Sequence, residues 1–396
     1  HIGAVAIGAT LFSFLFWGFG FLRMGTTGIA AQAAGAGDPQ ELAAAFARPF
    51  LLALALSLPL MILQAPIAWL SFELFEASAE TEALGRDYFD IRIWSAPAAL
   101  ANYVCLGWLL GIGRTGWVLA VQLLLNGANI LLDLVFVLGF DQGVAAAASA
   151  TVIAQSLALA PGILLVLRLS EGRLSAWRTL GLFDRARIVR LFRINADIFV
   201  RTIALLVVFT WFTVKGTELG DVTLAANAVL HNIFGLLAYG LDGFAWAAEA
   251  LVGRSIGARD RAGYRASVVD TMIWGLILAV TVAAAILVAG PAMIDVMTVD
   301  ATVREAARVY LLWAAAMPVV AVGCFMLDGV FIGATRTAEM RNGMLISLAA
   351  YAAAVWLIVP VWGNHGLWAA LMIFFMARTV TLGIWLPRIE RAMIDR

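Results

Sequence analysis

Long apolar stretches follow one another along the whole 396-residue sequence, separated by short segments rich in charge, glycine or proline. Each stretch holds roughly 20 residues or more, enough to cross a hydrocarbon core at about 1.5 Å rise per residue. Hydrophobic residues make up 63% of the chain and charged residues 13%, whereas a water-soluble domain carries about 25% charged residues. The sequence therefore predicts an all-α polytopic membrane protein with no room for a soluble domain.

The apolar stretches predict eleven membrane spans in two groups. Five are expected near residues 2–33, 42–70, 88–111, 117–140 and 144–168. Six are expected near residues 188–215, 222–253, 266–290, 306–333, 342–361 and 365–387. This grouping predicts an N-terminal lobe over 1–180 and a C-terminal lobe over 181–396, joined by a linker at about 169–187.

A shift of 222 positions overlays the chain on itself. It aligns 35–38 (GAGD) with 257–260 (GARD), and 111–115 (GIGRT) with 333–337 (GATRT). Residue 1 aligns with residue 223, while the second copy opens near 185, so about 38 residues (223 − 185) and a first helix are expected before His1. The full protein would then have twelve helices in two parallel-repeat lobes of six, the plan of many secondary transporters.

Loop charge predicts the orientation, because cytoplasmic loops retain arginine and lysine. The connection between the copies holds Arg168, Arg173, Arg178, Arg185, Arg187, Arg190 and Arg193. We therefore expect this loop and the arginine-rich C-terminus in the cytoplasm. Net charge is zero and gives no information about a nucleic-acid partner, and none is expected. The two cysteines lie in expected helices, which argues against a disulfide framework.

One carboxyl group stands out in the first copy. Asp133 lies inside an expected span, with Asn129 four residues earlier on the same helix face. A carboxyl shielded from water can titrate near neutral pH, which a proton-coupled carrier requires. Alternatively, the Asp and Asn seal two helices together.

The second copy carries several ionisable groups at membrane depth. Asp242, Glu249 and Asp328 could line a cavity that suits protons or a cation, or could simply be solvated there. Asn195 is a further candidate for this second-lobe cavity. Asp197 and Arg201 are four residues apart, so we expect an internal ion pair between them.

The sequence offers no basis for enzymatic chemistry. Residues 111–116 match G-x-G-x-x-G, but they follow a membrane helix rather than a strand, so dinucleotide binding has no structural support. No Walker loop, zinc-ligand spacing or nucleophile elbow occurs. Neither a metal nor an organic cofactor is expected.

Five segments carry a family resemblance: 21–28 (FLRMGTTG), 95–102 (SAPAALAN), 107–111 (GWLLG), 241–245 (LDGFA) and 327–342 (LDGVFIGATRTAEMRN). With them the chain resembles, end to end, the multidrug and toxic compound extrusion (MATE) family, and within it the branch named for DNA-damage-inducible protein F. The resemblance implies two six-helix lobes around a central cavity and efflux of amphiphilic, often cationic compounds in exchange for H⁺ or Na⁺.

The resemblance also implies roles for particular residues. In proton-coupled relatives an Asp of helix one, expected here before His1, is surrounded by groups that Asn102, Asn129, Asp133 and Thr151 match. Sodium-coupled relatives pair a Glu on helix seven with an Asp on helix ten. Asp328 matches that Asp, but Arg201 stands about where the Glu should be, so H⁺ is favoured over Na⁺ as coupling ion.

The expected protein is therefore a secondary active multidrug antiporter of the bacterial inner membrane, a monomer whose partners are amphiphilic small molecules and the bilayer. A Na⁺-coupled exporter of the same family is one alternative. A flippase for lipids or lipid-linked precursors is another, although it would favour a cationic cavity. A non-transporting membrane scaffold or a receptor-like sensor would have no internal ionisable pairs and a sizeable extramembrane domain, and neither feature fits this sequence.

Overall fold

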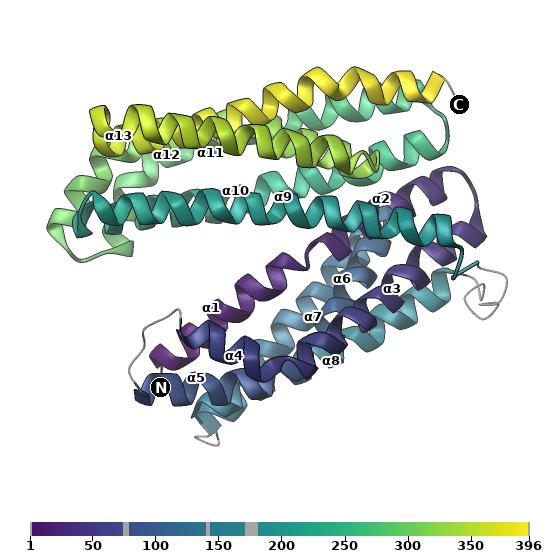
Figure 1. The fold of residues 1–396 in the computed structure, drawn as a ribbon, viewed down its shortest axis with the longest axis horizontal. Helices are drawn as coiled ribbons and strands as arrows, with labels where there is room; N and C mark the ends of the chain where they lie inside the picture. The colour runs from purple at the N-terminus through teal and green to yellow at the C-terminus, as the bar shows by residue number, and fades with distance from the viewer. Residues whose placement is uncertain (1, 74–78, 140–142, 171–180, 395–396) are drawn as a thin grey trace. The chain divides into compact units, whose positions relative to one another are not determined.

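A computed structural model describes residues 2–73, 79–139, 143–170 and 181–394 of the chain (Figure 1). The described residues form helices and turns and contain no strand, which confirms the predicted all-α class. The chain divides into two compact units, His1–Asn195 and Ala196–Arg396. The boundary falls inside one long helix, and the predicted lobe limits at 180 and 181 stay a prediction.

Several expected spans of the first unit are divided among shorter helices. They are α1 (Ile2–Gly18), α2 (Phe21–Gly35), α3 (Pro39–Ile62), α4 (Gln64–Glu73), α5 (Ala79–Arg92), η1 (Ile93–Ser95), α6 (Ala96–Gly111), α7 (Thr115–Asp133), the π-helical η2 (Leu134–Gly139) and α8 (Gly143–Leu169). The expected span 2–33 is interrupted between Gly18 and Phe21, and the span 88–111 changes to a 3₁₀ turn just before Pro97. Glycine and proline weaken helix continuity, which accounts for these breaks.

The second unit is built from long helices. They are α9 (Arg185–Glu218), whose first turns belong to the first unit, α10 (Asp221–Gly257), α11 (Arg261–Met297), α12 (Ala301–Gly333) and α13 (Thr337–Ile394). Helices α10 to α13 run side by side (Figure 1). Gly363, at φ 53° and ψ −129°, interrupts α13 between the two spans expected there. Each of the eleven expected spans therefore has a helical counterpart among the described residues.

Helix length and hydropathy agree with a membrane protein. Eight helices in the described part of the chain are long and apolar enough to cross a bilayer, and a ninth qualifies if the two halves of the bent α10 count as one. Large apolar side chains remain exposed on them, for example Leu58, Leu123 and Leu312 at 58%, 63% and 69%. Such surfaces are stable against lipid rather than water.

The internal repeat reappears as two pairs of matching turns. Gly37 and Arg259 are aligned by the repeat and both have positive φ (63° and 55°), as do Gly113 and Thr335 (74° and 53°). Each turn follows a helix and contains both hydrogen bonds of a Schellman motif. In the first pair, Asp38 N donates to Ala33 O at 3.2 Å and Asp260 N donates to Ser255 O at 2.9 Å.

Aspartates then start the next helix in both copies. Asp38 Oδ1 accepts from the backbone N–H groups of Gln40 and Glu41 at 3.0 and 2.9 Å. Asp260 Oδ1 accepts from Gly263 N at 2.9 Å. These N-caps satisfy donors that the first turns of α3 and α11 would otherwise leave unpaired.

Glycines set the closest helix contacts in both units. A Cβ on Gly107 of α6 would lie 2.4 Å from Arg23 O of α2, and one on Gly329 of α12 would lie 2.2 Å from Ala245 O of α10. The next glycine one turn on repeats the contact, since a Cβ on Gly333 would lie 2.4 Å from Glu249 O. Only glycine permits such backbone approach, the small-xxx-small packing of membrane helices.

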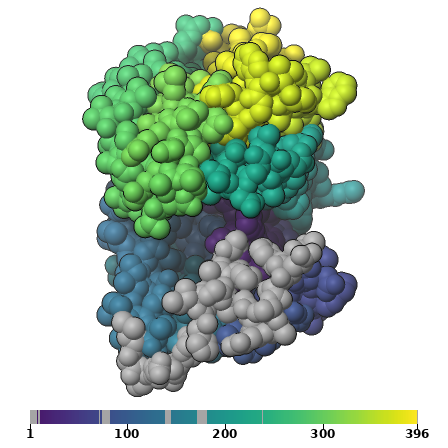
Figure 2. Space-filling view, turned by 90° about the vertical axis from the view of Figure 1, so that its left-hand side faces the viewer, coloured from purple at the N-terminus to yellow at the C-terminus, as the bar shows by residue number. Residues whose placement is uncertain are grey.

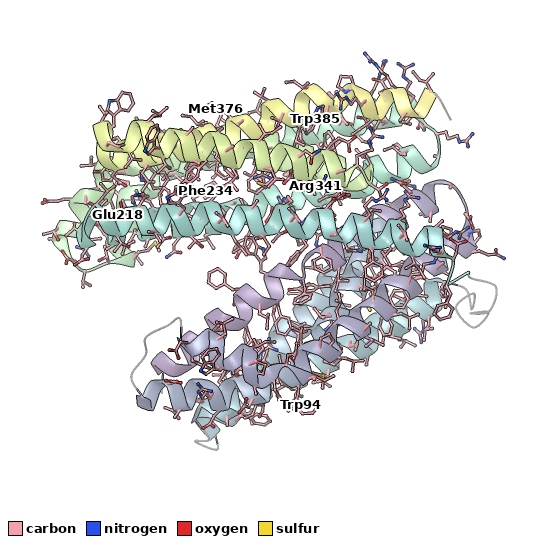
Figure 3. All side chains as sticks on the ribbon, in the orientation of Figure 1. Trp94, Glu218, Phe234, Arg341, Met376 and Trp385 are labelled. Carbon is pink, nitrogen blue, oxygen red and sulfur yellow. The ribbon has the colours of Figure 1, made fainter. Side chains whose placement is uncertain are left out.

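The two ends of the second unit differ. Arg341 and Trp385 lie toward one end and Glu218 toward the other (Figure 3). At the Glu218 end, the α11–α12 connection and the interrupted part of α13 form a continuous surface (Figure 2). Arg341 thus lies toward the end of this unit that loop charge predicts to be cytoplasmic.

Candidate functional site

A polar cluster in the first unit joins α5, α7 and α8. Asn129 Nδ2 donates to Thr151 Oγ1 at 3.1 Å, and Thr151 Oγ1 donates to Ala147 O at 3.0 Å. The buried Tyr88 of α5 lies near both Thr151 and Arg92. Two of the predicted site residues, Asn129 and Thr151, are therefore in direct contact.

Asp133 lies one helical turn beyond Asn129, where α7 passes into the π-helical η2. Its side chain is half-buried, and its Oδ1 makes no hydrogen bond with the described residues. It lies near Tyr88, which belongs to the same cluster. A half-buried carboxyl with an unused oxygen beside hydroxyl and amide groups is well suited to take up a proton.

Asn102 of α6 is hydrogen-bonded to Gln155 of α8, one turn after Thr151. Its Nδ2 donates to both the backbone O and the Oε1 of Gln155, each at 2.9 Å. Because Gln155 follows Thr151 by four residues, both lie on one face of α8. The sequence analysis missed Gln155, although its position one turn after Thr151 was a usable signal.

The sequence analysis also missed Arg92, a buried arginine near the end of α5. Its guanidinium lies 5.4 Å from the ring centroids of both Phe12 and Phe16, and its Nη1 donates to Ser95 Oγ. Cation–π contact and hydrogen bonds compensate part of the desolvation of the guanidinium. A charged residue inside the expected span 88–111 would have pointed to Arg92 as a candidate.

The second unit contains a buried group of two arginines and one aspartate. Asp328 Oδ2 accepts from Arg201 Nη2 and from Arg378 Nη2, so α9, α12 and α13 meet at a single carboxylate. The side chains of Arg201, Asp328 and Arg378 are only 11%, 8% and 3% exposed. Sequence reasoning missed Arg378, and the group carries a net charge of +1 (two arginines minus one aspartate).

The predicted ion pair between Asp197 and Arg201 is wrong. Asp197 Oδ1 instead accepts from Arg341 Nη1 at 2.5 Å, and its Oδ2 accepts from Thr337 Oγ1 at 3.0 Å. Spacing of four residues allows contact within one helix, but it does not outweigh better partners on neighbouring helices. Here α12 supplies Asp328 to Arg201, and α13 supplies Arg341 to Asp197.

The remaining second-lobe candidates are on α9 and α10. Glu249 is buried on α10, two turns after the half-buried Asp242. Asn195 is the last residue of the first unit, where its Nδ2 donates to Leu191 O at 2.8 Å. Whether these three residues serve a transport cavity stays a prediction.

A cavity of about 570 Å³ lies in the second unit between α9 and α13. Its lining includes Trp211, Trp356, and the ion pair of Lys215 with Glu218, whose Nζ and Oε2 are 2.6 Å apart. Lys215 is the sole lysine of the sequence. None of the predicted site residues lines this cavity.

The MatE family profile matches residues 1–135 and 198–359. The chain belongs to the MatE family. It is 40% identical over 394 residues to DNA damage-inducible protein F of Escherichia coli strain K12, covering 97% of this chain and 84% of that protein. These findings confirm the resemblance seen in the sequence.

Solved structures of MATE transporters share the fold. MATE in the bent conformation gives a TM-score of 0.88 at 19% identity, covering 99% of this chain and 89% of that one. The outward-facing conformation of a multidrug resistance MATE family transporter of the MOP superfamily gives 0.87, also at 19% identity, with the same coverage. This MatE protein is thus a multi-pass membrane transporter and not an enzyme, and its homologues support a role in efflux.

Proposed function

We propose that this MatE protein is a secondary active antiporter that exports amphiphilic, often cationic compounds in exchange for protons. Membership of a family of transporters supports the transport class, and the absence of nucleotide-binding motifs from the sequence favours an ion gradient as the energy source. The bacterial inner membrane is proposed as its location, because the relative with 40% identity is an Escherichia coli protein. Loop charge supports a cytoplasmic linker and C-terminus, and we propose a monomer.

The observation that carries proton coupling is the setting of Asp133. Its half-buried carboxyl has an oxygen without a hydrogen-bond partner in the described structure and stands one turn from the Asn129–Thr151 pair. An ionised carboxyl at membrane depth is unfavourable, so a proton taken up there stabilises the group. Release of that proton restores a negative charge that a cationic substrate can neutralise.

The second unit supports protons over sodium. Na⁺ requires carboxylate or carbonyl oxygens that are free to coordinate it. Asp328, the family-matched candidate, already accepts from two guanidinium groups. A cation approaching it would meet two positive charges at contact distance, so a Na⁺ site there is disfavoured.

Alternating access couples proton binding to the export of substrate. A ligand shifts a conformational equilibrium only by its different affinity for the two states. We propose that the protonated first-lobe site favours the outward-open state, where substrate leaves, and that deprotonation favours the inward-open state. Competition between proton and cationic substrate for one negative charge then couples the two fluxes.

The test compares Asp133→Asn with the parent, using full-length protein in liposomes that carry imposed H⁺ or Na⁺ gradients. Efflux of a lipophilic cation driven by the pH gradient should fall at least about tenfold in the variant, since the proton site is removed. Asp300→Asn, the same change at an exposed helix N-cap, is the matched control and should transport normally. Undiminished pH-driven efflux by Asp133→Asn, or efflux driven by Na⁺ alone, would refute proton coupling at this residue.

Flipping of a lipid-linked precursor is the second candidate function. The net positive charge of the Arg201–Asp328–Arg378 group favours an anionic headgroup such as pyrophosphate, the feature this alternative requires. A dithionite-quenching assay with a fluorescent polyprenyl pyrophosphate in the same liposomes separates the candidates. Rapid flipping without a pH gradient would favour the flippase.

A further inference from the structure

Three arginines and one glutamate surround a small cavity at the end of the first unit where α2, α3 and the start of α9 meet. It is lined by Ile29, Glu41, Ala44, Ala45, Arg48, Pro49, Arg187, Arg190 and Leu191. Its charged lining sums to +2 (three arginines minus one glutamate). Loop charge predicts that this end faces the cytoplasm.

The arginines are held in place by a network built around Glu41. Arg48 Nη1 donates to Glu41 Oε1 at 2.9 Å, and Arg48 Nη2 donates to Gly181 O at 3.3 Å. Arg187 Nη1 donates to the other glutamate oxygen, Oε2. One carboxylate thus orients two guanidinium groups from two helices and leaves the site with surplus positive charge.

The arginines of α9 remain accessible while Arg48 is buried. The side chain of Arg187 is 51% exposed, whereas that of Arg48 is 6% exposed. Arg190 is also exposed and donates to Gln32 Oε1 at 3.3 Å. Asp184 Oδ1 accepts from Arg187 N at 2.9 Å and so fixes the first turn of α9 that presents both side chains.

Apolar groups complete the site. Ile29, Pro49 and Leu191 line the same cavity as the arginines. Beyond Pro49, α3 continues with the exposed side chains of Leu51, Leu54 and Leu58. An anionic group and a hydrocarbon chain can therefore be accommodated side by side, which a soluble anion alone would not need.

From this geometry we infer that the cavity binds the phosphate of an anionic phospholipid of the inner leaflet, whose acyl chains lie against α3. Arginine forks match phosphate oxygens, and basic pockets between membrane helices at the cytoplasmic side recognise anionic headgroups. The bound lipid would join α3 to residues 181–191, which comprise the approach to α9 and its first turns. It would thereby stabilise the connection between the lobes.

The experiment titrates delipidated full-length protein in detergent with phosphatidylglycerol, read by native mass spectrometry and thermal unfolding. Phosphatidylcholine, glycerol phosphate and inorganic phosphate are run in parallel. Phosphatidylglycerol should bind at least about tenfold more tightly than phosphatidylcholine and should raise the unfolding temperature, because its net charge complements the site. Equal affinity for the two lipids would overturn the inference, as would saturation by inorganic phosphate or glycerol phosphate without lipid.

Two variants remove the accessible charges. Arg187→Gln with Arg190→Gln should weaken phosphatidylglycerol binding roughly 30-fold, about fivefold for each arginine lost near the anionic lipid. Arg185→Gln with Arg193→Gln is the matched control: it removes the same charge from exposed positions of the same helix that do not line the cavity. Equal weakening in both double variants would show general attraction to the helix and overturn the assigned site.

Glu41→Gln distinguishes lipid binding from a purely structural network. It raises the charge of the lining from +2 to +3, so phosphatidylglycerol should bind several-fold more tightly. The lipid should also restore the unfolding temperature that the lost ion pairs lower. If Glu41→Gln instead lowers both stability and lipid affinity, the arginines serve only to hold the linker and the inference fails.

Discussion

Replacing Asp328 by Asn should destabilise the second unit far more than replacing either arginine that contacts it. Asp328 is the sole described acceptor shared by Arg201 and Arg378, and none of the three side chains is more than 11% exposed. Asparagine keeps the volume but leaves two buried guanidinium groups without a counter-charge. Removing one partner of a buried ion pair costs about 3–5 kcal/mol, more than a hundredfold in the folding equilibrium.

Arg201→Met should be milder, because it leaves Asp328 and Arg378 as a neutral pair. We expect a loss below about 2 kcal/mol, since replacing one buried charge by an apolar side chain also removes its desolvation penalty. Glu82→Gln breaks the exposed pair with Arg86, whose side chains are 36% and 39% exposed, and should cost under about 1 kcal/mol. The predicted order of destabilisation is Asp328→Asn, then Arg201→Met, then Glu82→Gln.

The order can be measured by reversible unfolding in mixed micelles with increasing sodium dodecyl sulfate, followed by tryptophan fluorescence. Combining Arg201→Met, Asp328→Leu and Arg378→Met should recover most of the stability lost in Asp328→Asn, because no buried charge remains. If Arg201→Met proves as damaging as Asp328→Asn, the surplus positive charge is compensated elsewhere. The net charge assigned to this group would then be wrong.

Two further predictions use the internal repeat. Gly107→Ala and Gly329→Ala should each destabilise the protein by about 1–3 kcal/mol, because the new Cβ atoms would lie 2.4 and 2.2 Å from facing carbonyl oxygens. Gly116→Ala is the control: its Cβ would have no atom within 4 Å, so this variant should be neutral or stabilising in the same unfolding assay. Equal effects at all three positions would contradict the close packing. Arg259→Gly should stabilise the protein by about 1 kcal/mol, because glycine adopts the positive φ of 55° without strain. The reciprocal Gly37→Arg should destabilise it by a similar amount. A loss of stability in Arg259→Gly would mean that the arginine side chain matters more than the backbone conformation.

Hydropathy predicted the spans because each membrane helix must satisfy its own backbone, and this requirement is local in sequence. The same patterns did not reveal the breaks within spans, such as that between Gly18 and Phe21, since apolar residues continue on both sides. The family resemblance placed Asn129 and Thr151 around an Asp of helix one, but it did not predict the hydrogen bond between them. Its geometry needed the structure.

Ion pairs between helices were the part that sequence could not supply. Arg201 and Asp328 are 127 residues apart, and Asp197 and Arg341 are 144 apart, so no rule of helical spacing connects them. The rule that was applied, contact at four residues, selected Asp197 for Arg201 and was wrong. Only the packing of α9 against α12 and α13 decides which carboxylate meets which arginine.

The two lobes keep one backbone plan and differ in the charges placed on it. Gly107 and Gly329 make the same contact with a facing carbonyl, although the residues that provide it are Arg23 in one lobe and Ala245 in the other. Side chains at these contacts can change freely, because glycine meets only the backbone. One oxygen of each carboxyl, Asp133 Oδ1 and Asp328 Oδ1, lacks a hydrogen-bond partner in the described structure. The difference between the lobes is that Asp328 Oδ2 accepts from two arginines, whereas Asp133 makes no ion pair with the described residues. In the proposed mechanism the two lobes therefore meet the cost of burying a carboxylate in the membrane in two ways: the second lobe pairs Asp328 with arginines, and the first lobe is proposed to protonate Asp133.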